Sequence, residues 1–114
     1  MTTVSKPLID AKYAENAATT QYTAPALTRT HIDKFTATNV TGSPATLTVH
    51  LVKAAGTASA ANAITFTRSV AAGVTDLLPE LCGHVLGAGD FIATLAGTVS
   101  AIVIRASGRE VVQD

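Results

Sequence analysis

The stretch ATLTVHLV, residues 45–52, decides the fold class, because its side chains alternate in character from Ala45 to Leu51. Aliphatic residues occupy the odd positions from Leu47 to Leu51, and Thr or His occupies the even positions from Thr46 to His50. A period of two places one set of side chains on each face of an extended chain. The stretch therefore predicts a β-strand with one buried face.

The next run toward the N-terminus, residues 31–39, is also strand-like but changes its parity. Phe35 shares a face with Ala37 and Asn39, whereas Ile32 falls on the opposite parity. A β-bulge near Asp33-Lys34 would reconcile the two sets. Between this run and residues 45–52 lies Thr-Gly-Ser-Pro at 41–44, which is a turn signal. We therefore expect the two runs to form a β-hairpin.

Other segments have the same alternating or Thr-rich character. Further strands are predicted at 19–23, 64–70, 74–78, 91–96, 100–106 and 110–112. The strands at 91–96 and 100–106 are joined through Gly97-Thr98, which predicts a second hairpin. Residues 53–63 are rich in Ala, Gly and Ser, and we expect a flexible loop at one end of a sheet.

Residues 79–86 interrupt the strand pattern. Pro79 suits the first turn of a helix, and Glu80 suits its positive end. One helical face would gather positions 78, 81, 82 and 85, which are Leu, Leu, Cys and Val. Gly83 limits the helix to a turn or two. We expect a short helix that plugs one end of the fold.

Together these elements predict an all-β protein. The expected architecture is an antiparallel β-sandwich or jelly roll of about seven or eight short strands, with one short helical turn near residues 79–86. Residues 18–114 are expected to form a single domain, preceded by an N-terminal arm or flexible segment at 1–17. That segment has weak periodicity, and residues 8–15 would suit either a helical turn or an extended arm.

Composition narrows the classes of function. The formal net charge is zero and charged residues make up 14% of the chain, against about 25% in a typical domain. No basic run is present, so we expect no nucleic-acid partner. No apolar stretch approaches the ~20 residues of a membrane span, and the N-terminus shows no secretion signal, so we expect synthesis in the cytoplasm and no membrane association. The single cysteine, Cys82, excludes an internal disulfide.

The core must be built mainly from Ile, Leu, Val and Ala. The chain has three Phe, two Tyr and no Trp, and most of these aromatic residues are predicted to point inward. Such a core contains few large apolar side chains. We therefore expect part of the stability to come from contacts within a homo-oligomer.

The residues that could carry chemistry do not form a recognisable site. His31, His50 and His84 are not spaced as metal ligands, and Cys82 with His84 would be only a fragment of a zinc site. His31 and Asp33 could meet on one strand face, but no nucleophile motif accompanies them. We therefore expect a non-enzyme without catalytic residues, metal or cofactor.

Some remaining signals have structural explanations. Gly83, Gly87 and Gly89 are expected to serve turns, because no long helix follows them as a dinucleotide site requires. Asn39-Val40-Thr41 is formally a glycosylation sequon that should carry no sugar without secretion. Three arginines at 68, 105 and 109 are interpreted as residues of a solvated sheet face, with pairing across a subunit interface as the alternative.

Several segments resemble small virion proteins of tailed bacteriophages. These are residues 22–25, 32–39, 46–52, 78–81, 83–86, 89–92 and 104–110, within a span of about four-fifths of the chain. The resemblance is a pattern of strands and turns. It implies a β-sandwich or jelly-roll subunit placed on the capsid or tail as a decoration, cement or adaptor protein, and it supplies no active-site residues.

The leading expectation is therefore a capsid decoration or cement protein, located in the virion, that binds the major capsid protein or other virion proteins. The first alternative is a tail, neck or fibre-attachment component. A carbohydrate-binding β-sandwich is ranked lower, because few aromatic residues are expected at the surface for stacking on a sugar.

Overall fold

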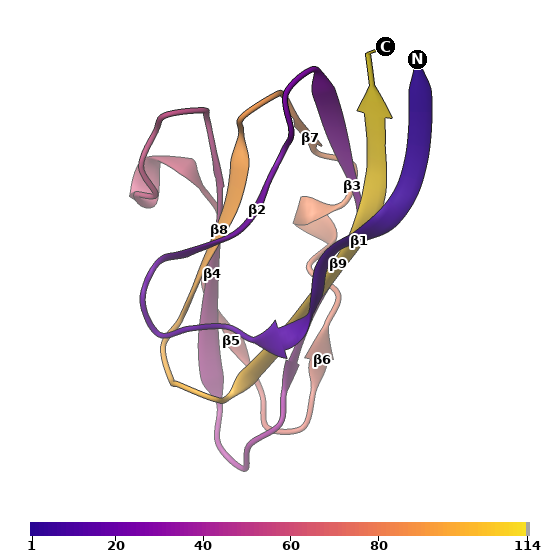
Figure 1. Ribbon diagram of the computed structural model, residues 1–114. Coiled ribbons are helices and arrows are strands. Elements are labelled where there is room, and N and C mark those ends of the chain that lie inside the picture. The colour runs from indigo at the N-terminus through magenta and orange to yellow at the C-terminus, as the bar shows by residue number, and fades with distance from the viewer. Residues whose placement is uncertain (114) are drawn as a thin grey trace.

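The computed structural model describes residues 1–113, so residue 114, the last of the predicted domain, lies outside them. The described chain folds into two antiparallel sheets, which form the two layers in Figure 1. The first sheet has the order β1 (Thr2–Tyr13), β9 (Ile102–Val112), β3 (Thr28–Asn39) and β6 (Thr75–Asp76), with β7 (Val85–Leu86) also paired to β3. The second has the order β2 (Thr19–Thr23), β8 (Phe91–Ala96), β4 (Ala45–Val52) and β5 (Ala63–Val70). The predicted all-β antiparallel sandwich is confirmed.

The core lies between the two layers. Alternate residues of facing strands supply it, among them Phe35 of β3, Leu47 and Val49 of β4, and Ile104 of β9, all with no exposed surface. Each such side chain contributes about 1.5–3 kcal/mol when it is removed from water. The odd positions of the 45–52 stretch thus point inward, as the alternation predicted, although Leu51 is only half-buried.

Both predicted hairpins are wrong. β3 belongs to the first sheet and β4 to the second, so residues 40–44 form an arch between layers. β8 and β9 are separated in the same way. An arch between sheets uses the same Gly, Ser and Pro residues as a hairpin turn. The residue types of the connection and the alternation of the strands therefore do not distinguish an arch from a hairpin.

The bulge predicted in residues 31–39 is present. The register between β3 and β9 shifts between Ile32 and Lys34, which brings both Ile32 and Phe35 to the buried face. The predicted separate strand at 110–112 is instead the end of β9, which continues through Gly108. A Cβ atom at position 108 would lie 2.0 Å from the His31 carbonyl oxygen, so only glycine fits where β9 crosses this part of β3.

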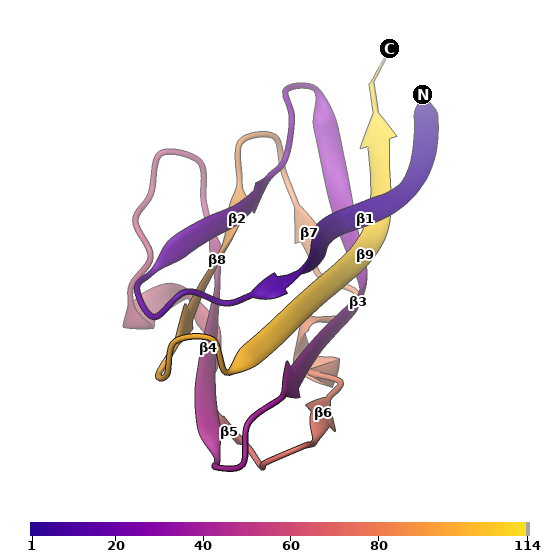
Figure 2. The same cartoon turned by 60° about the horizontal axis from the view of Figure 1, so that its bottom comes forward.

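The N-terminal segment is part of the first sheet. Residues 2–13 form β1, which pairs with β9 from Thr2 to Tyr13 with two register shifts, and no helical turn forms at 8–15. Leu8 and Ile9 are buried in the core. Both views show β1 and β9 side by side, with the two ends of the chain at the same tip of the molecule (Figures 1 and 2).

The helical turn predicted near 79–86 is shorter than expected. A 3-10 helix, η2, spans Pro79–Leu81, with Pro79 in its first turn. Leu78 and Leu81 are fully buried as predicted. Cys82 and Val85, assigned to the same face, are exposed, because the backbone is already extended at Cys82 and then turns at Gly83. η2 contacts β3 and β5 and so covers the side of the sandwich where the edges of the two sheets meet.

The even positions of β4 are more buried than the alternation predicted. Thr48 and His50 are only 6% and 5% exposed, although they lie on the outer face of the second sheet. The chain between β4 and β5 folds back here through a second 3-10 helix, η1 (Ala60–Asn62), which contacts β4. The segment predicted as a flexible loop therefore packs against part of this face, beside His50.

Candidate interaction surfaces

The histidines and the cysteine are dispersed over the fold. His31 lies on the outer face of the first sheet, His84 is exposed after η2, and His50 is buried on the outer face of the second sheet. Cys82 is exposed. Within residues 1–113, no three His, Cys, Asp or Glu side chains are grouped as metal ligands.

Asp33 is engaged by an arginine across the sheet. The Nε and Nη2 atoms of Arg109 each donate to a different oxygen of the Asp33 carboxylate at 3.0 Å. Hydrogen bonding from Arg109 lowers the pKa of Asp33 and raises that of Arg109. Arg109 lies opposite His31 in the register between β3 and β9, and the β-bulge at Asp33 brings the Asp33 carboxylate to it. Two parallel hydrogen bonds to one carboxylate are typical of a guanidinium. Asp33 thus pairs with Arg109 on the solvated outer face, beside His31.

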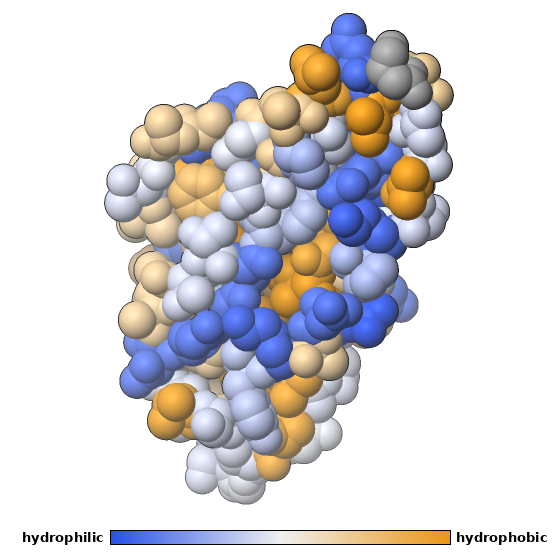
Figure 3. All heavy atoms as spheres, viewed as in Figure 1, coloured by the Kyte–Doolittle hydropathy of each residue, from blue (hydrophilic) through white to orange (hydrophobic). Residues whose placement is uncertain are grey.

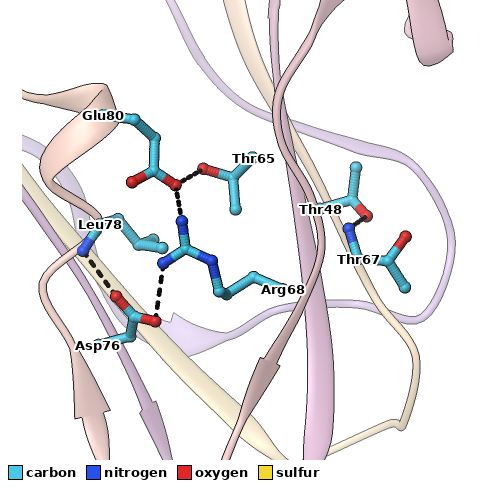
Figure 4. Close-up of polar contacts among 7 residues, drawn as sticks. All are labelled: Thr48, Thr65, Thr67, Arg68, Asp76, Leu78 and Glu80. Atoms are coloured by element: carbon cyan, nitrogen blue, oxygen red, sulfur yellow. Dashed lines mark hydrogen bonds and ion pairs between the residues drawn. The ribbon is translucent and has the colours of Figure 1, made fainter.

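Arg68 connects the edges of the two sheets (Figure 4). Its guanidinium donates to Asp76 of β6, at 3.0 Å, and to Glu80 of η2. Glu80 also accepts a hydrogen bond from the hydroxyl of Thr65, and Asp76 accepts one from the Leu78 backbone N–H. We refer to Arg68, Asp76, Glu80 and Thr65 as the edge clasp. Arg68 and Arg109 are thus paired within the chain, and Arg105 is exposed on the outer face of the first sheet.

The environment of the edge clasp favours its charged form. The Leu78 N–H lowers the pKa of Asp76, with partial burial opposing and Arg68 adding to the effect. For Glu80, burial raises the pKa, but the hydrogen bonds from Thr65, its own backbone N–H and Arg68 outweigh it, so the pKa is lowered. Both carboxylates are therefore ionised at neutral pH.

Exposed apolar side chains gather at the tip where β1, β9 and the start of β3 lie side by side. We define the terminal ribbon as residues 2–7 of β1, 107–112 of β9 and 28–34 of β3, with Met1 and Leu27 at its end. The molecule measures 47 × 26 × 20 Å, and the ribbon occupies the tip of its long dimension in Figure 1. Apolar atoms are visible at this tip in Figure 3. Met1, Leu27 and Val4 are 83%, 66% and 46% exposed.

Leu27 is held in an unfavourable backbone conformation. Its φ of 57° lies in the left-handed region, where a side chain beyond Cβ is disfavoured. Its carbonyl accepts a hydrogen bond from the backbone N–H of Gln113 at 2.8 Å, which ties the end of β9 to the start of β3. A shallow cavity of about 350 Å³ opens beside it, lined in part by Met1, Arg29 and Val111.

A buried polar contact joins the ribbon to the second sheet. The hydroxyl of Tyr22 in β2 donates to the Glu110 carboxylate in β9 and lies 2.7 Å from the hydroxyl of Thr30 in β3. Lys6 of β1 adds an ion pair to Glu110 at 3.5 Å. Burial, then the hydrogen bond to Glu110, raises the pKa of Tyr22 well above its ordinary value. Tyr22 thus ties the middle of the ribbon to the second sheet, while the side chains of Leu27 and Val4 stay exposed.

A second concave surface lies on the outer face of the second sheet. This groove, which we call the β4–β5 groove, has a volume of about 530 Å³ and runs between β4 and the chain that folds back through η1. The end of β8, with Leu95 and Ala96, also lines it, as does Phe66, which has 68% of its surface exposed. Its polar lining residues are Asn16, Thr46, Thr48, His50, Ser59 and Thr67.

Two features of these surfaces were not predicted. Most aromatic residues were expected to point inward, but Phe66 and Tyr13 are exposed. Phe66 and Thr67 both lie opposite Thr48, because the register between β4 and β5 shifts there. No Gly marks this bulge in the sequence, so nothing in the pattern revealed it. The exposed position of Leu27 likewise carries no sequence signal.

Comparisons of the chain with protein-family models, with curated proteins and with solved structures found no match. Among residues 1–113, no helix has the length and apolar character needed to span a bilayer.

Proposed function

We propose that this protein is a structural subunit of a tailed-phage virion, which attaches to the outside of the capsid shell as a decoration or cement protein. Support comes from the resemblance of its segments to small virion proteins and from its β-sandwich fold. It would act through protein contacts, in many copies, without a reaction of its own.

The observation that carries this proposal is the exposed apolar end of the terminal ribbon. Leu27 is both 66% exposed and held at positive φ, a combination that folding alone does not favour. Removing such a side chain from water on binding would contribute about 1–2 kcal/mol. A contact of this size is weak alone but becomes effectively permanent when copies that bridge neighbouring capsomers act together.

The first experiment is co-sedimentation of the purified protein with expanded capsids of the phage that encodes it. We expect binding at a fixed number of copies per capsid that saturates with concentration. Leu27→Asn should reduce binding, since it removes the apolar side chain and places at this backbone position a residue that tolerates it. Val99→Asn is the matched control, because Val99 is also exposed, at 62%, and lies in the loop between β8 and β9.

A native mass measurement tests the alternative of a tail, neck or fibre-attachment component. A closed ring of copies that does not bind capsids would favour that assignment and reject the decoration role. Equal capsid binding by the Leu27 variant and the unaltered protein would reject the ribbon as the contact surface.

A further inference from the structure

The β4–β5 groove is shaped by a strained bulge in β5. Thr67 has a φ of 47°, which is unfavourable for a β-branched residue. Its backbone N–H is not left unpaired, because it donates to the Thr48 hydroxyl at 2.9 Å (Figure 4). Both Phe66 and Thr67 consequently line the groove. Strain of about 1–3 kcal/mol persists only where its surroundings enforce it, and it concentrates at binding sites.

His50 is one of the residues that line this groove, with 5% of its surface exposed. Asn62 fixes its orientation, since the Asn62 Oδ1 atom lies 3.0 Å from His50 Nδ1 and also accepts from the Ser59 N–H at 3.0 Å. The Asn62 Nδ2 atom donates to the Thr57 carbonyl at 2.9 Å, so Oδ1 is the acceptor and Nδ1 of His50 must carry the proton. In the neutral ring, Nε2 is then an acceptor, and it makes no hydrogen bond within residues 1–113.

The chemistry of the lining restricts the ligand. The groove contains no Asp, Glu, Lys or Arg side chain, which disfavours a charged ligand. Hydroxyls of Thr46, Thr48 and Ser59 can donate or accept, and Phe66 offers an aromatic face. Its volume of about 530 Å³ falls within the range of about 300–1,000 Å³ for small-molecule sites.

We propose that the β4–β5 groove binds a neutral saccharide. A pyranose ring has an apolar C–H face that would stack on Phe66, and hydroxyls at its rim that would donate to His50 Nε2 and exchange hydrogen bonds with Thr48. The groove lies on the second sheet and the terminal ribbon on the first, so saccharide binding does not depend on the proposed capsid contact.

The test is saturation-transfer NMR on the full-length protein with methyl glycosides of glucose, galactose and N-acetylglucosamine. We expect transfer from the Phe66 ring to the C–H protons of at least one glycoside at about 20 mM, above a dissociation constant of about 1 mM. The same glycoside should shift the amide signals of Thr48 and Thr67. Phe66→Ala should weaken binding at least about tenfold, since it removes the stacking face.

Two further variants separate binding from folding. Tyr13→Ala removes an aromatic side chain that is 49% exposed on the other sheet, and it should leave affinity unchanged. His50→Asn retains a donor toward Asn62 and removes the Nε2 acceptor, and it should weaken binding in a protein with an unchanged fold. The proposal is overturned if no glycoside shifts groove signals, or if Phe66→Ala binds as well as the unaltered protein.

Discussion

Asn39 is the polar residue on which the arch between β3 and β4 depends. Its side chain has no exposed surface, and its amide donates to the carbonyls of Ser43 and Val70 at 2.8 and 2.9 Å. Its oxygen accepts from the backbone N–H and the hydroxyl of Thr41. Since both amide hydrogens are used, the formal sequon at Asn39 is inaccessible to glycosylation in the folded protein.

We predict that Asn39→Ala lowers the free energy of unfolding by about 3 kcal/mol, because it leaves buried carbonyl and N–H groups without partners. Thr38→Ala, which removes only an exposed hydroxyl contact with Thr75, should cost less than about 1 kcal/mol. Urea unfolding followed by circular dichroism measures both. Equal losses in the two variants would contradict the role given to Asn39.

Gly108 allows the backbones of β9 and β3 to approach each other closely at His31. Gly108→Ala should lower the free energy of unfolding by at least about 2 kcal/mol, since the new methyl group would meet the His31 carbonyl and the Leu8 side chain. Gly42→Ala is the control: a Cβ there has no atom within 4 Å. Removing that glycine should be neutral or stabilise by up to about 1 kcal/mol. Thermal unfolding of the two variants distinguishes them.

The buried positions were predictable where the alternation of the sequence is regular. Leu47 and Val49 were assigned to the core, and the bulge between Ile32 and Lys34 followed from a change of parity. The positions of Leu27 and Thr67 were not predictable, because both have positive φ without being Gly, Asn or Asp. Leu27 of the terminal ribbon and Thr67 of the β4–β5 groove therefore could not be identified from the alternation of the sequence.

At the scale of elements, the edge clasp joins β5 to β6 and η2. Its carboxylates have lowered pKa values in the folded state, so the unfolded chain takes up protons first as the pH falls. Their contribution to stability is complete above the ordinary values of 3.8 and 4.5 and is lost as the pH falls through the lowered folded values.

We predict that Arg68→Met reduces stability at pH 7 by about 1 kcal/mol, a modest figure because Arg68 is partly exposed. The variant should also lose less stability than the unaltered protein between about pH 5 and about pH 3, the range in which Asp and Glu side chains ordinarily take up protons. Urea unfolding at a series of pH values tests this. Parallel pH profiles for the two proteins would show that Arg68 does not add to the lowering of these carboxyl pKa values.

The strands themselves were largely predictable, but their partners were not. The segments now seen as β2, β4, β5 and β8 were located from composition and period alone. Which sheet each strand joins depends on how the inner faces of the two sheets pack against each other. Residues far apart in the chain contribute to that packing. The arches at 40–44 and 97–101 carry ordinary turn residues, so the sequence offered no reason to reject hairpins there.

For the whole molecule, zero net charge and an apolar tip determine how the proposed attachment to a capsid should respond to salt. An apolar contact is not weakened by ionic screening, whereas contacts between exposed charges are lost when the Debye length falls to about 3 Å at about 1 M salt. We predict that capsid binding persists at about 1 M sodium chloride. Release of the protein under those conditions, measured by sedimentation, would indicate attachment through charged residues such as Arg29 or Arg105.

The class of the whole molecule could be predicted, because repeated short alternating segments without long helices permit few architectures. The exposed terminal ribbon could not. It arises because β1 and β9 pair out to their ends, and pairing between the first and last strands of a chain leaves no local signal.

We propose that the tip of the terminal ribbon, with Leu27 and Val4, is the surface through which this protein binds a capsid shell. A cryo-EM reconstruction of expanded capsids incubated with the protein tests it most directly. We expect added density at symmetric positions, with the ends of β1 and β9 against the capsid surface and the β4–β5 groove outside that contact. Capsids without added density, or copies attached through the second sheet with the ribbon free, would contradict it.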